Sequence, residues 1–184
     1  MQHNICNHKT CDEIRKRRNS KLGGGIGIAY IVNYNHSGQY AIMLGKERFG
    51  AYKNMYSLCS GKLDPCDNNC YIKAAKRESG EEFKIDIQDK KIFDTVFKNS
   101  NGKTRFIMHN GTPILIGVIN GVSRKQINPL IEACNNNAQL DHSLKEMSKV
   151  DYFWLQNGQQ IEGKKSTLSG YASAIISKID VNKL

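Results

Sequence analysis

Bulky and β-branched residues gather in short runs along this chain, and turn-forming residues separate the runs. Such runs predict buried β-strands. The Asn-Gly pairs at residues 101–102 and 110–111 lie between three consecutive runs and predict antiparallel neighbours. The predicted strands cover residues 26–32, 39–44, 92–98, 104–108, 114–119 and 150–155.

Two segments have helical periodicity instead. Residues 69–83 run into an acidic stretch, and residues 167–179 place Tyr171, Ile175 and Ile179 on one apolar face. Strands with one helix in the middle and another at the end predict an α/β fold with a mixed sheet.

Length and composition predict one domain. The chain has 184 residues and 39% hydrophobic content, enough for one core. We expect that domain to cover residues 23–184. Residues 1–22 are polar and basic, with Arg-Lys-Arg-Arg at 15–18, and we expect a flexible arm that could instead be a short helix or a nucleic-acid contact.

The most informative polar pattern lies in the predicted central helix. Glu78, Glu81 and Glu82 are spaced i, i+3 and i+4, so a helix places the three carboxylates on one face. Crowded carboxylates repel one another unless a cation lies among them, and such oxygen ligands suit Mg²⁺ or Mn²⁺. The alternative is a solvated helix face with an i, i+4 ion pair between Arg77 and Glu81.

The preceding residues favour the metal site. Residues 56–65 predict a short strand, a glycine-containing turn and a proline-led loop, so strand, loop and acidic helix follow one another. With Gly61, Arg77-Glu78, Glu81-Glu82 and the closing Ile85, this segment resembles the signature of the Nudix hydrolase family. Asp67 stands where that signature has its first glutamate.

Besides Asp67, the segment departs from the signature in its loop, at Ser79 and at Lys84. The loop is two residues longer, at Asn68-Asn69, and Ser79 occupies a position that is usually apolar. Gly80 weakens a helix interior by about 1 kcal/mol. Lys84 occupies the place of a glycine, so either Lys84 adopts a left-handed conformation or the helix ends differently.

The resemblance implies an α/β/α sandwich with a mixed sheet, a Nudix helix at about 69–83 and a C-terminal helix at about 167–179. It implies that two or more of the three glutamates bind Mg²⁺ or Mn²⁺, with Glu82 the first choice and Glu78 the next. Gly61 could add a carbonyl ligand, and Lys62 in the same loop is a candidate substrate-binding residue. Arg77, which by helix geometry points away from the ligand face, would orient a carboxylate.

A general base is also expected. The resemblance places it before a late strand, where Glu146 is the candidate. Asp141, Glu132 and Glu81 are the alternatives. An exposed residue without a catalytic role is the competing interpretation of Glu146.

Substrate residues are sought in the loop after the second strand. Arg48, Phe49 and Tyr52 could meet phosphates and stack on a base, although packing under a loop explains them equally well. Lysine and arginine exceed aspartate and glutamate by 27 to 17, a net charge of +10 that favours polyanionic partners. Small nucleotides, capped RNA and diphosphoinositol polyphosphates are therefore the substrates considered.

Two functions other than hydrolysis stay open. One is a non-catalytic Nudix-like module that binds RNA or nucleotides. The other is a small basic nucleic-acid binder with an unrelated fold. The sequence predicts neither the oligomeric state nor the phosphorus that is attacked.

The six cysteines are interpreted as reduced thiols. No secretory signal or membrane span is predicted, so we expect a cytoplasmic or nuclear protein without a disulfide framework. Zinc binding by His3, Cys6, His8 and Cys11 is the alternative, as is metal binding or redox pairing by Cys66 and Cys70.

Overall fold

The computed structural model describes residues 6, 8–18, 24–32, 39–120, 147–157, 159–161 and 168–184. These residues contain a sheet of eight strands in the order β5-β6-β1-β2-β7-β8, with β4 paired to β1 and β3 to β2. The pair β1 and β6 is parallel, and the other pairs are antiparallel. The strands are β1 Gly25–Val32, β2 Gln39–Glu47, β3 Tyr56–Ser57, β4 Cys59–Lys62, β5 Phe106–His109, β6 Thr112–Ile119, β7 Met147–Gln156 and β8 Gln159–Gln160.

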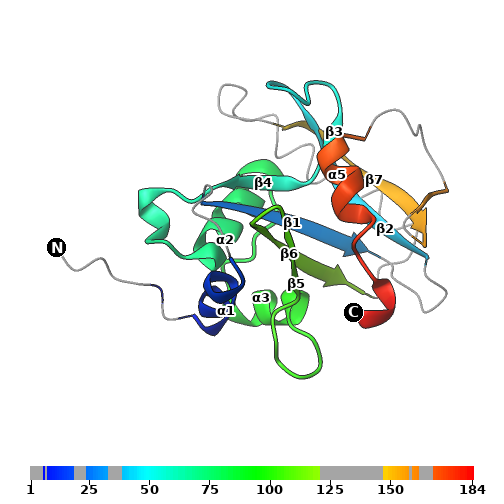
Figure 1. The fold of residues 1–184 in the computed structure, drawn as a ribbon. Helices are drawn as coiled ribbons and strands as arrows, with labels where there is room; N and C mark the ends of the chain where they lie inside the picture. The colour runs from blue at the N-terminus through cyan, green and yellow to red at the C-terminus, as the bar shows by residue number, and fades with distance from the viewer. Residues whose placement is uncertain are drawn as a thin grey trace.

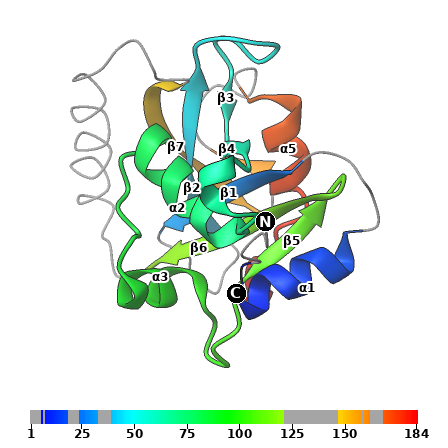
Figure 2. The ribbon, with the colours of Figure 1, turned by 90° about the vertical axis from the view of Figure 1, so that its left-hand side faces the viewer.

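Helices cover both faces of this sheet. One core cluster joins β1 to residues of α1, α2 and α3, and the other joins β1 to residues of α5. Figure 1 shows β1 between β6 and β2, and Figure 2 shows α2 and α5 on opposite sides of these strands. The predicted α/β/α sandwich with a mixed sheet is confirmed. The helices are α1 Lys9–Arg17, α2 Tyr71–Glu82, α3 Lys90–Phe97 and α5 Gly170–Ile176, with short 3₁₀ turns η1 Pro65–Asp67 and η4 Val181–Lys183.

The central strand β1 shows why the apolar runs predict the sheet. Every residue from Ile26 to Val32 is buried. Successive side chains alternate between the two cores, with Tyr30 in the α2 cluster and Ile31 in the α5 cluster. A strand covered on both faces needs apolar residues at consecutive positions.

The predicted acidic helix is confirmed as α2. Its Ser79, where the signature has an apolar residue, is fully buried and accepts a 2.6 Å hydrogen bond from the Tyr30 hydroxyl. A Cβ at Gly80 would have no neighbour within 4 Å. The helix ends because Lys84 takes a left-handed conformation with φ 55°, and the Ile85 N–H then donates to the Ser79 carbonyl at 3.0 Å.

The strand predicted at residues 92–98 is wrong, because this segment is helix α3. Asp89 caps it, since its carboxylate accepts hydrogen bonds from the Lys91 and Ile92 N–H groups at 2.8 and 3.0 Å. Phe93 and Phe97, four residues apart, stack with ring centroids 4.8 Å apart. A short apolar run does not distinguish a strand from a helix, and the cap decides here.

The hairpin that follows agrees with the prediction. Strands β5 and β6 pair in antiparallel register. Asn110 and Gly111 between them have φ of 48° and 77°, the left-handed pair that tight hairpin turns require.

The first residues that the structure describes pack against the domain, whereas the sequence predicts a flexible arm. Helix α1 buries Cys11 and Ile14 completely in the α2 core. Arg18 donates a 2.6 Å hydrogen bond to the Tyr71 hydroxyl at the start of α2. Cys6 is joined to Cys70 by a disulfide, whereas the sequence analysis expects reduced thiols. This stretch is therefore part of the packed structure.

The C-terminal helix is shorter than predicted. Helix α5 begins after Ser169, whose hydroxyl accepts a 3.0 Å hydrogen bond from the Ala172 N–H, and it ends at Ile176. Ile179 still reaches the core through the turn that follows. Within the described residues, no helix has the length and apolar content needed to span a bilayer.

Replacing the α3 cap tests the correction at residues 92–98. We expect Asp89→Ala to lower the free energy of unfolding by about 1 kcal/mol, because two N–H groups lose their acceptor. Asp89→Asn keeps an acceptor and should change it little. Urea unfolding of both variants measures the difference, and equal values for Asn and Ala would contradict a capped helix.

Candidate functional site

The candidate site lies where β4, the loop after it and α2 meet beside the start of β1 (Figure 1). A cavity of about 640 Å³ opens there. Residues of β4 and α2 supply most of its polar lining. They include Ser60, Gly61, Arg77, Glu78, Glu81 and Glu82.

The guanidinium of Arg77 connects the segments around this cavity. Its Nη1 donates to Glu78 Oε1 at 2.7 Å and to Glu81 Oε2 at 3.0 Å. Its Nη2 donates to Asp67 Oδ2 at 3.0 Å and to the Lys62 carbonyl at 2.9 Å. Arg77 therefore lies among the carboxylates, not turned away from them as helix geometry suggests, and it ties β4, η1 and α2 together.

The charge of Arg77 is secured by these partners. The hydrogen bond to Asp67, followed by the charge of Glu78, raises the pKa of Arg77 against the opposing effect of burial. Arg77 is thus a permanent cation in the site. Its role in turnover stays a prediction.

Asp67 replaces the first glutamate of the signature and still reaches Arg77. Its side chain is buried, and its Oδ2 also accepts a 2.8 Å hydrogen bond from the Asp64 N–H. The two additional residues that follow, Asn68 and Asn69, have φ of 51° and 55°. Asparagine tolerates the left-handed region better than most residues, so the loop takes these conformations while Asp67 is bonded to Arg77.

Gly61 is required by the position of Glu78. A Cβ on Gly61 would overlap the Glu78 carboxylate. Gly61 is held in place by its pairing with Ile26 of β1. The missing side chain is what lets the buried Glu78 carboxylate lie against β4.

Glu82 is held by the backbone of β4. Its Oε2 accepts a 2.8 Å hydrogen bond from the Ser60 N–H, and the residue is buried. Cys59 lies next to it and is completely buried. Burial, and then the charge of Glu82, raise the pKa of the Cys59 thiol well above its usual range, so Cys59 stays protonated.

Glu81 is the exposed member of the three, with 59% of its side chain accessible. Among the described residues, the oxygens of Glu78, Glu81 and Glu82 do not gather within the distance at which one cation could touch all three. Joint coordination therefore requires a new rotamer for at least one of them. Oxygen donors at the wall of the cavity fit Mg²⁺ or Mn²⁺ in chemical type.

The predicted substrate residues lie on the loop between β2 and β3. Phe49 is 61% exposed and Tyr52 is 41% exposed. The Arg48 guanidinium carbon lies 5.3 Å from the centroid of the Phe49 ring. Phe49 and Tyr52 line a second cavity, of about 260 Å³. Arg48, Phe49 and Tyr52 thus lie on one loop, and none of them lines the main cavity.

Helix α5 contributes a site residue that the sequence does not mark as one. Tyr171 lines the main cavity, and so does Thr112 at the start of β6. Burial, followed by the charge of nearby Tyr52, raises the pKa of Tyr171 to about 12. In the sequence Tyr171 is one apolar position of a helix, and no local signal distinguishes it. The predicted bases Glu146, Asp141 and Glu132 lie outside the described residues.

Comparison with known proteins gives matches in structure alone. No protein-family model and no curated sequence matches the chain. A MutT/nudix family protein from Enterococcus faecalis superimposes with a TM-score of 0.49 and 10% identity, over 93% of this chain and 68% of that one. The NUDIX domain of Shewanella oneidensis NrtR complexed with ADP ribose gives 0.42 and 9%, over 72% and 73%. An Ap4A hydrolase from C. elegans gives 0.41 and 14%, over 73% and 80%. Likeness at this level assigns neither family nor activity.

Adding one methyl group at Gly61 tests the packing against Glu78. We expect Gly61→Ala to lower the free energy of unfolding by about 1 kcal/mol, because the displaced carboxylate loses a hydrogen bond from Arg77. In a Glu78→Ala background the same change should be nearly neutral, since the overlapping group is gone.

Gly80→Ala is the matched control. Gly80 lies in α2, the helix of Glu78, and has open space around it. The substitution should therefore raise the free energy of unfolding by about 0.5–1 kcal/mol. Urea unfolding measures all four variants. An equal loss from Gly61→Ala with and without Glu78 would show that the two residues do not interact.

Proposed function

We propose that this chain is a metal-dependent pyrophosphohydrolase of the Nudix type, which cleaves a nucleoside-diphosphate-linked substrate by attack of water on phosphorus. The observation that carries the proposal is the Arg77 network. One guanidinium binds Asp67, Glu78 and Glu81 at the wall of a cavity, and Gly61 leaves room for Glu78. These residues stand at positions of the signature that the sequence resembles, and hydrogen bonds from Arg77 connect three of them.

Glu78 and Glu82 are the proposed metal ligands, with Glu81 and the Gly61 carbonyl as further donors. Bound Mg²⁺ or Mn²⁺ would neutralise phosphate charge and acidify a water molecule. Both glutamates are buried and already held by hydrogen bonds, Glu78 by Arg77 and Glu82 by the Ser60 N–H. Ligands fixed in this way lose little side-chain entropy on binding.

The chain's own residues also prepare the reaction. Arg77 restrains the directions of Glu78 and Glu81, a positioning role. Lys62 is exposed at the cavity and offers a charge to substrate phosphates. Glu81, the most exposed carboxylate of the three, can accept a proton from the attacking water. Glu146 stays the alternative base.

The loop between β2 and β3 is the proposed site for the nucleoside. An exposed Phe49 with Arg48 over its ring offers one face for stacking a base and a cation for phosphate. A net charge of +10 adds long-range attraction for any polyanion. These features support a small nucleotide or the cap of an mRNA as substrate.

RNA contact through the basic segment 15–18 is a further part of the proposal. Arg15 binds Asp12, and Arg17 binds Glu13 while its guanidinium carbon lies 4.9 Å from the centroid of the Phe106 ring. Arg15 and Arg17 therefore already use part of their charge in contacts within the chain. Any RNA contact there would compete with them.

A non-catalytic nucleotide-binding module is the second candidate. It is favoured by one observation, that the three glutamates bind Arg77 and Ser60 and are not gathered around a common point. A module of this kind would keep the loop of Phe49 and the cavity. It would have no need of a metal.

Activity separates the two candidates. We expect the wild type with Mg²⁺ or Mn²⁺ to release products from at least one member of a panel of nucleoside triphosphates, nucleotide sugars, dinucleoside polyphosphates and cap-labelled RNA. Glu82→Gln should lower turnover by about two orders of magnitude or more, because a lost ligand removes charge stabilisation in the transition state.

Glu13→Gln is the control, since it neutralises a glutamate of α1 that pairs with Arg17. It should leave turnover unchanged. Circular dichroism confirms that both variants are folded. A wild type inactive on the whole panel, or a Glu82→Gln variant as active as the wild type, would overturn the hydrolase proposal.

The substrate loop gives a separate prediction. Phe49→Ala should raise KM about tenfold and change kcat little, because base stacking on an aromatic ring contributes about 1–3 kcal/mol of binding. Ile92→Ala is the control, an exposed apolar side chain on α3. Steady-state kinetics on the best substrate measures both, and equal KM values for the two variants would remove Phe49 from the substrate site.

A further inference from the structure

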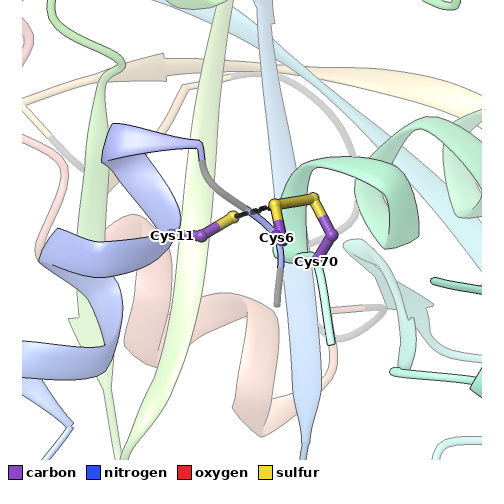
Figure 3. Close-up of side chains that lie close together, drawn as sticks. All are labelled: Cys6, Cys11 and Cys70. Carbon is purple, nitrogen blue, oxygen red and sulfur yellow. Dashed lines mark hydrogen bonds between the residues drawn. A yellow bond between two sulfur atoms is a disulfide. The ribbon is translucent and has the colours of Figure 1, made fainter. Parts of the chain in front are cut away.

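Three cysteines meet where α1 approaches the start of α2. Cys6 precedes α1, Cys11 lies in the first turn of α1, and Cys70 is the N-cap of α2. Figure 3 shows their sulfur atoms turned toward one another between the two helices. Cys11 Sγ lies 3.6 Å from Cys6 Sγ and 3.8 Å from Cys70 Sγ, and Cys6 is bonded to Cys70.

Two of the three sulfur separations, those from Cys11, are those of a thiolate metal site. Four sulfurs at about 2.3 Å around a tetrahedral Zn²⁺ are separated by about 3.8 Å from one another. Both distances from Cys11 match this edge. Among the described residues, this is the one group of three or more Cys, His, Asp or Glu ligand atoms that lie within 4.8 Å of one another.

We propose that the reduced form of Cys6, Cys11 and Cys70 binds a thiophilic divalent cation, with Zn²⁺ the best fit. This site is separate from the carboxylate site, because soft sulfur donors select a different class of metal from hard oxygen donors. It differs from both metal sites considered in the sequence, since it combines Cys6 and Cys11 with Cys70. The His8 imidazole is turned elsewhere, with Nδ1 accepting a 3.3 Å hydrogen bond from the Thr10 N–H.

Binding requires the disulfide to open first. Two equivalents of a thiol reductant break the bond between Cys6 and Cys70, giving two protein thiols and one oxidised reductant disulfide. The cation then displaces a proton from each of the three thiols. Oxidation therefore closes the site and reduction opens it.

Positive charge lies close to the three sulfurs. Arg15 adds positive charge nearby, since its guanidinium donates a 3.3 Å hydrogen bond to the Cys6 carbonyl. Cys70 occupies the positive end of a twelve-residue helix.

A bound cation would fasten the N-terminal segment to the helix of the candidate active site. Cys6 and Cys70 are 64 positions apart, and Cys70 immediately precedes α2. Arg15 already bridges this junction, since it donates to the Cys6 carbonyl at 3.3 Å and to the Asn69 carbonyl at 3.0 Å. Metal at the three sulfurs would fix the point from which α2 begins.

Cobalt titration of the full chain tests the site. The protein is reduced with a phosphine under anaerobic conditions, freed of metal and titrated with Co²⁺. We expect one equivalent to bind, with sulfur-to-cobalt charge-transfer absorption and the d–d bands of a tetrahedral ion, and Zn²⁺ should abolish both signals. The readout is independent of catalysis, so it does not depend on the proposed hydrolase.

Serine variants locate the ligands. Cys11→Ser and Cys70→Ser should lose the charge-transfer band, as should Cys6→Ser, which replaces a half-buried residue and perturbs the core least. Cys66→Ser is the matched control, because Cys66 is an exposed free cysteine outside the group, and it should bind Co²⁺ as the wild type does. A reduced wild type without the band would overturn the proposal, as would equal binding by the oxidised protein.

Discussion

The candidate site depends on one charged side chain shared by several acceptors. Arg77 is largely buried, with 20% of its side chain accessible, and its partner Asp67 is 3% accessible. Taking such charges out of water is costly unless their hydrogen bonds are met. Arg77 meets this condition by binding Asp67, Glu78 and Glu81 together with the carbonyl of Lys62. The helix, the loop and the strand edge are consequently fixed relative to one another.

This constraint explains how the segment accommodates the positions at which the sequence differs from the signature it resembles. Asn68 and Asn69 lengthen the loop through left-handed conformations while Asp67 keeps its bond to Arg77. Ser79 accepts a hydrogen bond from the Tyr30 hydroxyl, and the helix ends where Lys84 takes a positive φ. Each departure changes the backbone or the core, and none removes a carboxylate from the cavity.

Local pattern predicts the parts of this fold whose neighbours along the chain determine them. The prediction is correct for the apolar run at β1, the acidic helix α2 and the turn at Asn110-Gly111. In each of these, burial or turn geometry depends on residues that are consecutive in the sequence. The run at 92–98 fails because its helix depends on the cap at Asp89, and a run of that length fits either structure. Packing of α1 against α2 is likewise invisible in sequence, since its polar composition resembles a mobile arm.

The site itself divides in the same way. The helical spacing of Glu78, Glu81 and Glu82 is readable from the sequence, whereas the approach of Tyr171 and the meeting of Cys6, Cys11 and Cys70 depend on chain folding over long separations. The orientation of Arg77 is also a tertiary property, because Asp67 and the Lys62 carbonyl attract it from outside its own helix.

The central claim is that the Arg77 network holds carboxylates for a hard divalent cation. Isothermal titration of the disulfide-containing protein with Mn²⁺ tests it directly, since the closed disulfide keeps the cysteine site out of the measurement. The account predicts saturable binding by the wild type and its loss in the Glu78→Gln, Glu82→Gln double variant, with both proteins folded. Equal Mn²⁺ affinity in the two proteins, or none in the wild type, would contradict the account.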